Sequence, residues 1–131
     1  MIYHASTNGL IVKVRPEFME AQSDPDENLY IWSYHVRIEN EGEITVQLRE
    51  RHWEITDSYG QTRRVDGEGV VGMQPIITPG DFFEYNSAAS LKTPSGFMNG
   101  HYDFEDEDGN ELKIKIPGFS LDSHYQTVVL Q

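Results

Sequence analysis

The feature that most constrains this chain is an alternation of apolar and polar side chains with a period of two. It is clearest from Leu29 to Glu39, where aromatic and β-branched residues share one face and polar residues share the other, interrupted only by Leu29 and Ile31 at the beginning. Successive side chains of a strand point to opposite faces of a sheet, so this segment predicts a strand with its aromatic face in the core. The residues expected in the core are Tyr30, Trp32, Tyr34, Val36 and Ile38.

The same period recurs along the rest of the chain. Strands are expected over Leu10 to Val14, Ile44 to Leu48, Met98 to Phe104 and Leu112 to Ile116. The tail from Tyr125 to Leu130 is a candidate edge strand. Apolar stripes with helical spacing are missing from the sequence, which favours an all-β fold.

The alternation changes phase in one of these segments. Apolar residues occupy even positions through Leu48 but odd positions at Trp53 and Ile55. A single extra residue in a strand exchanges its two faces, so Arg49 to His52 are expected to contain a β-bulge or a bend. A hairpin turn is expected over Glu107 to Asn110, because Asp-Gly tolerates the positive φ that such turns require.

These elements predict an antiparallel β-sandwich, since about seven or eight short strands are separated by turn signals at roughly 8 to 12 residue intervals. The 131 residues contain no internal repeat and no convincing interdomain linker. We therefore expect one domain over residues 1–131. The stretch from Phe18 to Asn28 is expected to form a long acidic loop inside that domain.

The charge balance excludes several classes of partner. The chain has 10 Lys and Arg against 22 Asp and Glu, a net charge of -12, which repels nucleic acids and anionic membranes. It has no cysteine, so disulfides, thiolate metal sites and cysteine nucleophiles are excluded. The sequence contains neither a secretory signal nor a long apolar segment, and a cytoplasmic protein is the expectation.

Residues Gly67 to Gly72 match the GxGxxG spacing of a dinucleotide-binding loop. Such a loop requires a helix after it, and Pro75 and Pro79 exclude a helix at this place. The glycines are then architectural, or they form an anion nest beside an arginine. We favour the architectural interpretation, in which Arg63 and Arg64 only alternate along an edge strand. The residues of the anion-binding hypothesis are Arg64, Gly67, Gly69 and Gly72.

Spacing along the chain predicts neither a metal site nor a catalytic site. The five histidines lack an HxH or HExxH pattern, and the acidic run from Asp103 to Asp108 fails the EF-hand test because Phe104 and Lys115 would occupy ligand positions. GxSxG and Walker motifs are missing. We expect no catalytic residues, no cofactor and no tight site for magnesium, calcium or cobalt. Histidines can still converge through the fold, and His101 is the first candidate.

Several blocks of the sequence together resemble the ApaG family. The resemblance runs roughly from Thr7 to Leu121, and its most specific part is a glycine block followed by a TPxGxMxGHY-like block. The matching segments are Arg51 to Trp53, Gly67 to Pro75, Pro79-Gly80, Thr93 to Tyr102 and Ile116 to Phe119.

The resemblance implies an immunoglobulin-like or fibronectin-type-III-like sandwich and an association with cobalt tolerance and magnesium efflux, that is, with divalent cation homeostasis. Related domains in eukaryotes lie in protein-interaction contexts, and the family has no established catalytic residues. The leading hypothesis is a noncatalytic module that binds a protein partner. The alternative is a binding protein for a divalent cation or for a small anion such as pyrophosphate or a dinucleotide polyphosphate. An enzyme acting on such phosphates is the third possibility.

Overall fold

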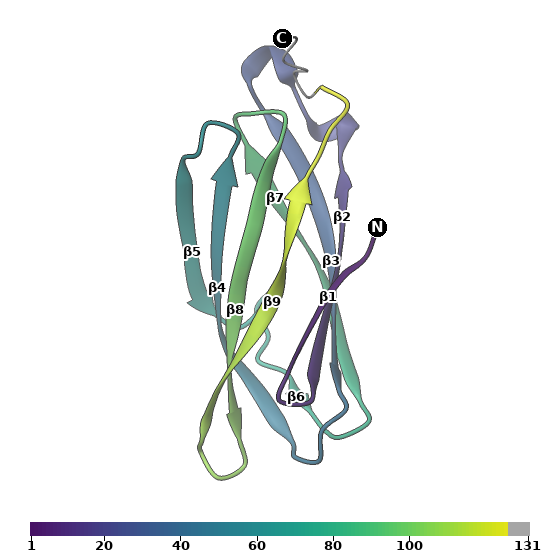
Figure 1. The fold of residues 1–131 in the computed structure, drawn as a ribbon, viewed down its shortest axis with the longest axis vertical. Helices are drawn as coiled ribbons and strands as arrows, with labels where there is room; N and C mark the ends of the chain where they lie inside the picture. The colour runs from purple at the N-terminus through teal and green to yellow at the C-terminus, as the bar shows by residue number, and fades with distance from the viewer. Residues whose placement is uncertain (126–131) are drawn as a thin grey trace.

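Two antiparallel sheets pack face to face in the computed structural model, which describes residues 1–125 (Figure 1). The chain crosses between the sheets after β3, β6 and β7. In spatial order, the first sheet consists of β1 (Tyr3–Thr7), β2 (Leu10–Phe18), β3 (Tyr30–Asn40) and β7 (Phe82–Leu91). The second consists of β5 (Thr62–Glu68), β4 (Val46–Asp57), β8 (Gly96–Asp106) and β9 (Glu111–Leu121), with β6 (Ile76–Ile77) paired to β4.

The sandwich predicted from the sequence is confirmed, and β1 and β6 are additions to it. Neither strand shows a recognisable apolar–polar alternation in the sequence, because β1 consists mostly of polar residues and β6 is only two residues long. The acidic loop contains two 3-10 turns, η1 (Glu20–Gln22) and η2 (Pro25–Glu27). The described helical turns include none that is long and apolar enough to cross a membrane. The edge strand expected over Tyr125 to Leu130 lies, apart from its first residue, outside the described residues.

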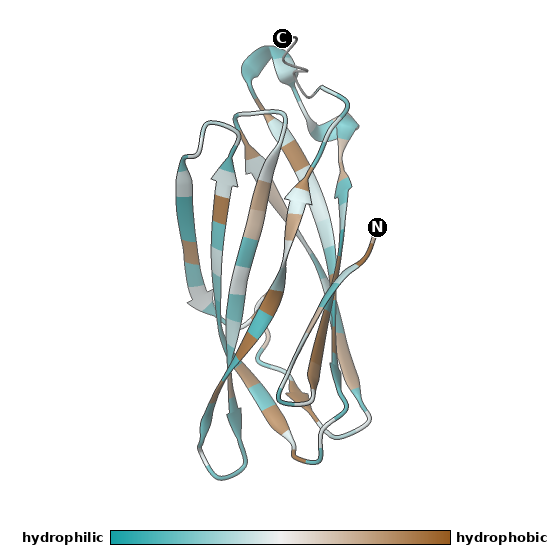
Figure 2. Ribbon diagram, viewed as in Figure 1, coloured by the Kyte–Doolittle hydropathy of each residue, from teal (hydrophilic) through white to brown (hydrophobic). Residues whose placement is uncertain are grey.

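The core lies between the two sheets, and the strands carry alternating bands of hydropathy as they cross it (Figure 2). All five residues expected to face inward from β3 are buried, which confirms the predicted face. The Trp32 indole donates a hydrogen bond from Nε1 to the carbonyl oxygen of Asp122 at 2.8 Å. Tyr85 on β7 and Tyr102 on β8 join their hydroxyl groups across the interior, which makes a polar contact between the two sheets inside an apolar core.

The predicted change of phase is present in β4. Its pairing with β8 shifts register between Leu48 and Glu50, which is a β-bulge or equivalent irregularity. Leu48 before the shift and Trp53 after it are both buried. The irregularity therefore keeps Trp53 in the core and turns His52 to the outer face of the sheet.

We expect Trp32→Ala to lower the free energy of unfolding by roughly 3 to 5 kcal/mol, because it empties a fully buried indole site. Urea unfolding followed by circular dichroism measures the loss. Tyr59→Ala is the control, since this side chain is 84% exposed and its truncation should cost within about 0.5 kcal/mol. A loss below about 1 kcal/mol for Trp32→Ala would contradict its place in the core.

Candidate functional site

A row of polar residues crosses the outer face of the second sheet. Strand pairing places His52 of β4 opposite Asp66 of β5 on one side and opposite His101 of β8 on the other. His101 in turn lies opposite Lys115 of β9. The neighbours Trp53 and Tyr102 point inward and are buried, so the two histidines point outward together.

The two imidazole rings are stacked and held by carboxylates. Their centroids lie 4.6 Å apart with the planes inclined by 25°. His52 Nδ1 lies 2.7 Å from Oδ1 of Asp66, and His52 Nε2 lies 2.6 Å from Oδ2 of Asp103. His101 Nε2 lies 3.5 Å from Oδ1 of Asp103, which is two residues further along β8 on the same face. Asp103 is thus shared by both rings.

The two stacked histidines have opposite electrostatic environments. The hydrogen bond to Asp66 raises the pKa of His52, against a smaller desolvation effect, and Asp103 adds to the rise. Desolvation lowers the pKa of His101, although Asp103 opposes this, and the nearby charge of His52 lowers it further. The pKa of Asp66 falls because of its hydrogen bond to His52. His52 is therefore the more readily protonated of the two rings.

The histidine cluster also contains the one group of three candidate metal ligands found among residues 1–125. His52, His101 and Asp103 each offer one ligand atom, and the three atoms lie within 4.8 Å of one another. The expectation of no metal site came from spacing along the sequence, which does not show the pairing of β4 with β8. Asp66 was missed at that stage altogether, because only the register of β5 against β4 brings it to His52.

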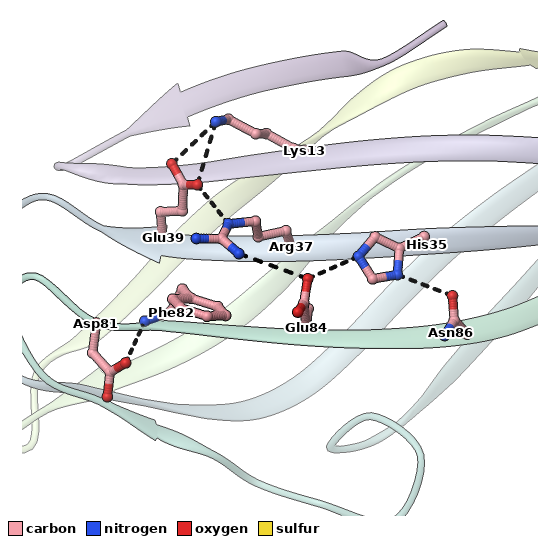
Figure 3. Close-up of polar contacts among 8 residues, drawn as sticks. All are labelled: Lys13, His35, Arg37, Glu39, Asp81, Phe82, Glu84 and Asn86. Carbon is pink, nitrogen blue, oxygen red and sulfur yellow. Dashed lines mark hydrogen bonds and ion pairs between the residues drawn. The ribbon is translucent and has the colours of Figure 1, made fainter.

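The outer face of the first sheet carries a second polar network (Figure 3). Glu39 accepts hydrogen bonds from Arg37 Nε at 2.7 Å and from Lys13 Nζ at 3.3 Å. The hydrogen bond from Arg37 is the main cause of the lowered pKa of Glu39. His35 lies between Glu84 and Asn86, at 3.0 Å from each. These groups satisfy one another along β2, β3 and β7, which is typical of a solvated sheet face.

The glycine segment forms a tight turn and no helix follows it, as predicted. Val70 and Met73 exchange two backbone hydrogen bonds of 2.8 Å around Val71 and Gly72. Val71 and Gly72 both have positive φ, at 44° and 79°. Such a pair of positive φ values belongs to a two-residue hairpin turn of type I′.

Arg64 and Gly69, two of the four residues of the anion-binding hypothesis, have partners within the protein. Arg64 forms ion pairs with Glu54 at 3.7 Å and with Asp66 at 3.9 Å, while the N–H of Gly69 donates to the carbonyl of Arg49 at 2.8 Å. Arg51, which is not among the residues of that hypothesis, is the arginine that lies against Gly67. It packs on Gly67 and donates from Nη1 to the carbonyls of Glu68 and Gly69. Anion binding stays an untested hypothesis.

The two sheets define an immunoglobulin-like, fibronectin-type-III-like β-sandwich. The model of the ApaG domain matches residues 20–106, and the chain belongs to the ApaG domain family. Protein ApaG of Rhodospirillum centenum is 52% identical over 122 residues, which cover 93% of this chain and 94% of the relative. The crystal structure of a Bordetella pertussis protein described as ApaA is 41% identical with a TM-score of 0.85, covering 89% of this chain and 95% of that one.

A second curated relative gives the same result. Protein ApaG of Paramagnetospirillum magneticum is 50% identical over 125 residues, which cover 95% of this chain and 96% of the relative. The resemblance identified from the sequence blocks is therefore confirmed over most of the chain.

We expect the two stacked histidines to titrate on opposite sides of the ordinary histidine value. As the pH rises, His101 should lose its proton first and His52 later, because His52 is bonded to Asp66 and His101 is desolvated. NMR titration of the imidazole signals in metal-free protein measures both. Asp66→Asn should lower the pKa of His52, whereas Glu107→Gln, which removes an equal charge at a hairpin tip, should leave it in place. Equal pKa values for the two rings would contradict this arrangement.

We expect Gly69→Ala to destabilise the protein more than Gly72→Ala. A Cβ at Gly69 would lie 2.3 Å from the carbonyl oxygen of Met73, whereas nothing lies within 4 Å of one at Gly72. Both positions have positive φ, so Gly72→Ala should lose about 1 kcal/mol from the backbone alone and Gly69→Ala clearly more. Thermal unfolding measures both losses.

The same melts, repeated with millimolar pyrophosphate, test the anion nest. The architectural interpretation predicts the same losses with and without the ligand, at matched magnesium and ionic strength. A saturable rise in Tm for the wild type, lost in folded Arg64→Ala or Gly69→Ala protein, would establish an anion site instead.

Proposed function

We propose that this domain is a noncatalytic protein-binding module and that the turn from Val70 to Met73 is its principal contact. The observation that carries the proposal is a β-branched residue in a left-handed conformation with its side chain in solvent. Val71 has φ 44° and is 55% exposed. A β-branched residue at positive φ is strained by about 1 to 3 kcal/mol, and such strain gathers at functional sites.

Further exposed apolar side chains follow Val71 directly. Met73 is 52% exposed and Ile76 is 64% exposed, so three apolar groups lie on one short segment. Side chains of this kind are typical anchors for a protein partner when they gather on a surface. Val70 points the other way and is buried, which fastens the turn to the core.

The segment is held rigidly on the second sheet. Arg51 ties the carbonyls of Glu68 and Gly69, and Gln74 Nε2 donates to the carbonyl of Arg49 at 2.9 Å. Gln47 Nε2 donates back to the carbonyl of Gln74 at 3.1 Å. A segment that is already fixed loses little conformational entropy when a partner binds. A small contact area can then give a higher affinity than it would on a mobile segment.

The chain belongs to the ApaG domain family, and the proposal adds a role in protein binding to that membership. We also propose that the protein is cytoplasmic, as expected from its sequence. Its partner should then be a cytoplasmic protein. It assigns no chemistry to the turn, because apolar side chains and internally bonded backbone groups offer neither an acid nor a nucleophile.

Two substitutions at Val71 separate strain from binding. Val71→Gly should raise the free energy of unfolding by up to about 1 kcal/mol, since glycine adopts this φ without strain. Both Val71→Gly and Val71→Asp should lose the partner, because each removes the exposed apolar group. Unfolding melts measure the first effect, and affinity capture from the native cytoplasm with mass spectrometry measures the second.

The matched control is Tyr59→Asp, which replaces an exposed apolar group in the turn at the other end of β5. It should keep the partner that the Val71 variants lose. A partner retained by Val71→Asp, or lost equally by Tyr59→Asp, would refute the assignment of the contact to this turn.

A further inference from the structure

Strand pairing gathers two imidazoles and a carboxylate at one place on the second sheet. His52 and His101 are directly opposed on β4 and β8, and Asp103 follows His101 on the same face. These two strands occupy the middle of the four-strand order, so their backbones are held by neighbours on both sides. Ligands placed on paired central strands keep their spacing better than ligands on loops.

The separations suit a single ion. The three ligand atoms lie within 4.8 Å of one another, with His52 Nε2 at 2.6 Å and His101 Nε2 at 3.5 Å from the oxygens of Asp103. Two ligand atoms at about 2.0 to 2.2 Å from a common transition metal stand roughly 3 to 4 Å apart. The two rings are stacked in the metal-free protein, so both must turn their Nε2 lone pairs toward the ion to enclose it.

Asp66 supplies what a histidine ligand needs behind it. It lies 2.7 Å from Nδ1 of His52, on the side of the ring that faces away from Asp103. A carboxylate at this position keeps the proton on Nδ1 and leaves Nε2 free for the metal. The carboxylates of Asp66 and Asp103 also balance the two positive charges of a divalent ion, in place of the proton on His52.

The types of ligand select the class of metal. Imidazole nitrogen with one carboxylate suits zinc and its transition-metal neighbours, whereas magnesium and calcium require sets of oxygen ligands. The three residues fill only part of a coordination shell. An open hollow lined by His52, Arg64, His101 and Lys115 adjoins the cluster and leaves room for water or a further ligand.

We propose that His52, His101 and Asp103 form a binding site for one divalent transition-metal ion of the zinc class, with Asp66 positioning His52. The site is independent of the proposed protein contact at Val71. It replaces the expectation, drawn from spacing along the chain, that no dedicated metal site exists, and it keeps the expectation that magnesium and calcium do not bind here.

Isothermal titration of tag-free, metal-free protein with Zn²⁺ tests the site. The titration is done at mildly alkaline pH, because zinc must displace a proton from His52. We expect one ion per chain with a dissociation constant in the micromolar range or below, and no saturable binding of Mg²⁺ or Ca²⁺. Asp66→Asn should weaken zinc binding by about 10-fold to 100-fold, the effect of removing a carboxylate behind a histidine ligand. His101→Ala and Asp103→Asn should weaken it more.

His35→Ala is the matched control, because His35 also lies on an outer strand face next to a carboxylate but outside the cluster. It should bind zinc like the wild type. Imidazole NMR signals of the wild type give a test that needs no variant: zinc should shift those of His52 and His101 and leave those of His35 unchanged.

The proposal is overturned if the wild type shows no one-site binding, or if His101→Ala and Asp103→Asn retain its affinity. Equal loss in His35→Ala, or zinc-induced shifts spread over all the histidines, would mark the binding as adventitious and would overturn it as well.

Discussion

Much of the second sheet depends on the irregularity between Leu48 and Glu50 in β4. A strand with unbroken alternation would bury His52 in the same layer as Leu48 and would expose Trp53. The shift in register keeps the Trp53 indole in the core and places the His52 imidazole on the outer face of the sheet. Core packing and the polar row on the sheet therefore depend on the same local distortion.

The two outer faces of the sandwich use polar residues differently. On the first sheet, alternating charges along β2, β3 and β7 pair with neighbours and complete a network in which Glu39 and Glu84 both have cationic partners. On the second sheet, His52 and His101 share Asp103, and each ring contacts a different oxygen of its carboxylate. Deprotonated imidazole nitrogens can give a lone pair to a cation, whereas the nitrogens of Lys13 and Arg37 on the first sheet have no lone pair to give. This contrast, rather than the number of charges, distinguishes the two faces.

The sequence predicted the fold well because period-two alternation depends only on local geometry. It located the core face of β3, the change of phase near Arg49 and the lack of a helix after Gly72, since each is a property of adjacent residues. The side-chain cluster was a different problem. His52 and His101 are 49 residues apart, and only the pairing of β4 with β8 makes them neighbours. Pairing partners in a sandwich follow from long-range packing, which spacing does not encode.

The hydroxyl contact between Tyr85 and Tyr102 has a consequence for how the two sheets align. Apolar contacts are non-directional, so they specify the alignment of the two sheets less sharply than a hydrogen bond does. Shifting one sheet along the other by one residue pair would leave both phenol hydroxyl groups buried without a hydrogen-bond partner. Each unpaired hydroxyl group would cost about 1 to 3 kcal/mol. The hydrogen bond between the two tyrosines therefore adds little to the net stability of the sandwich. Its main effect is to help specify how the two sheets align.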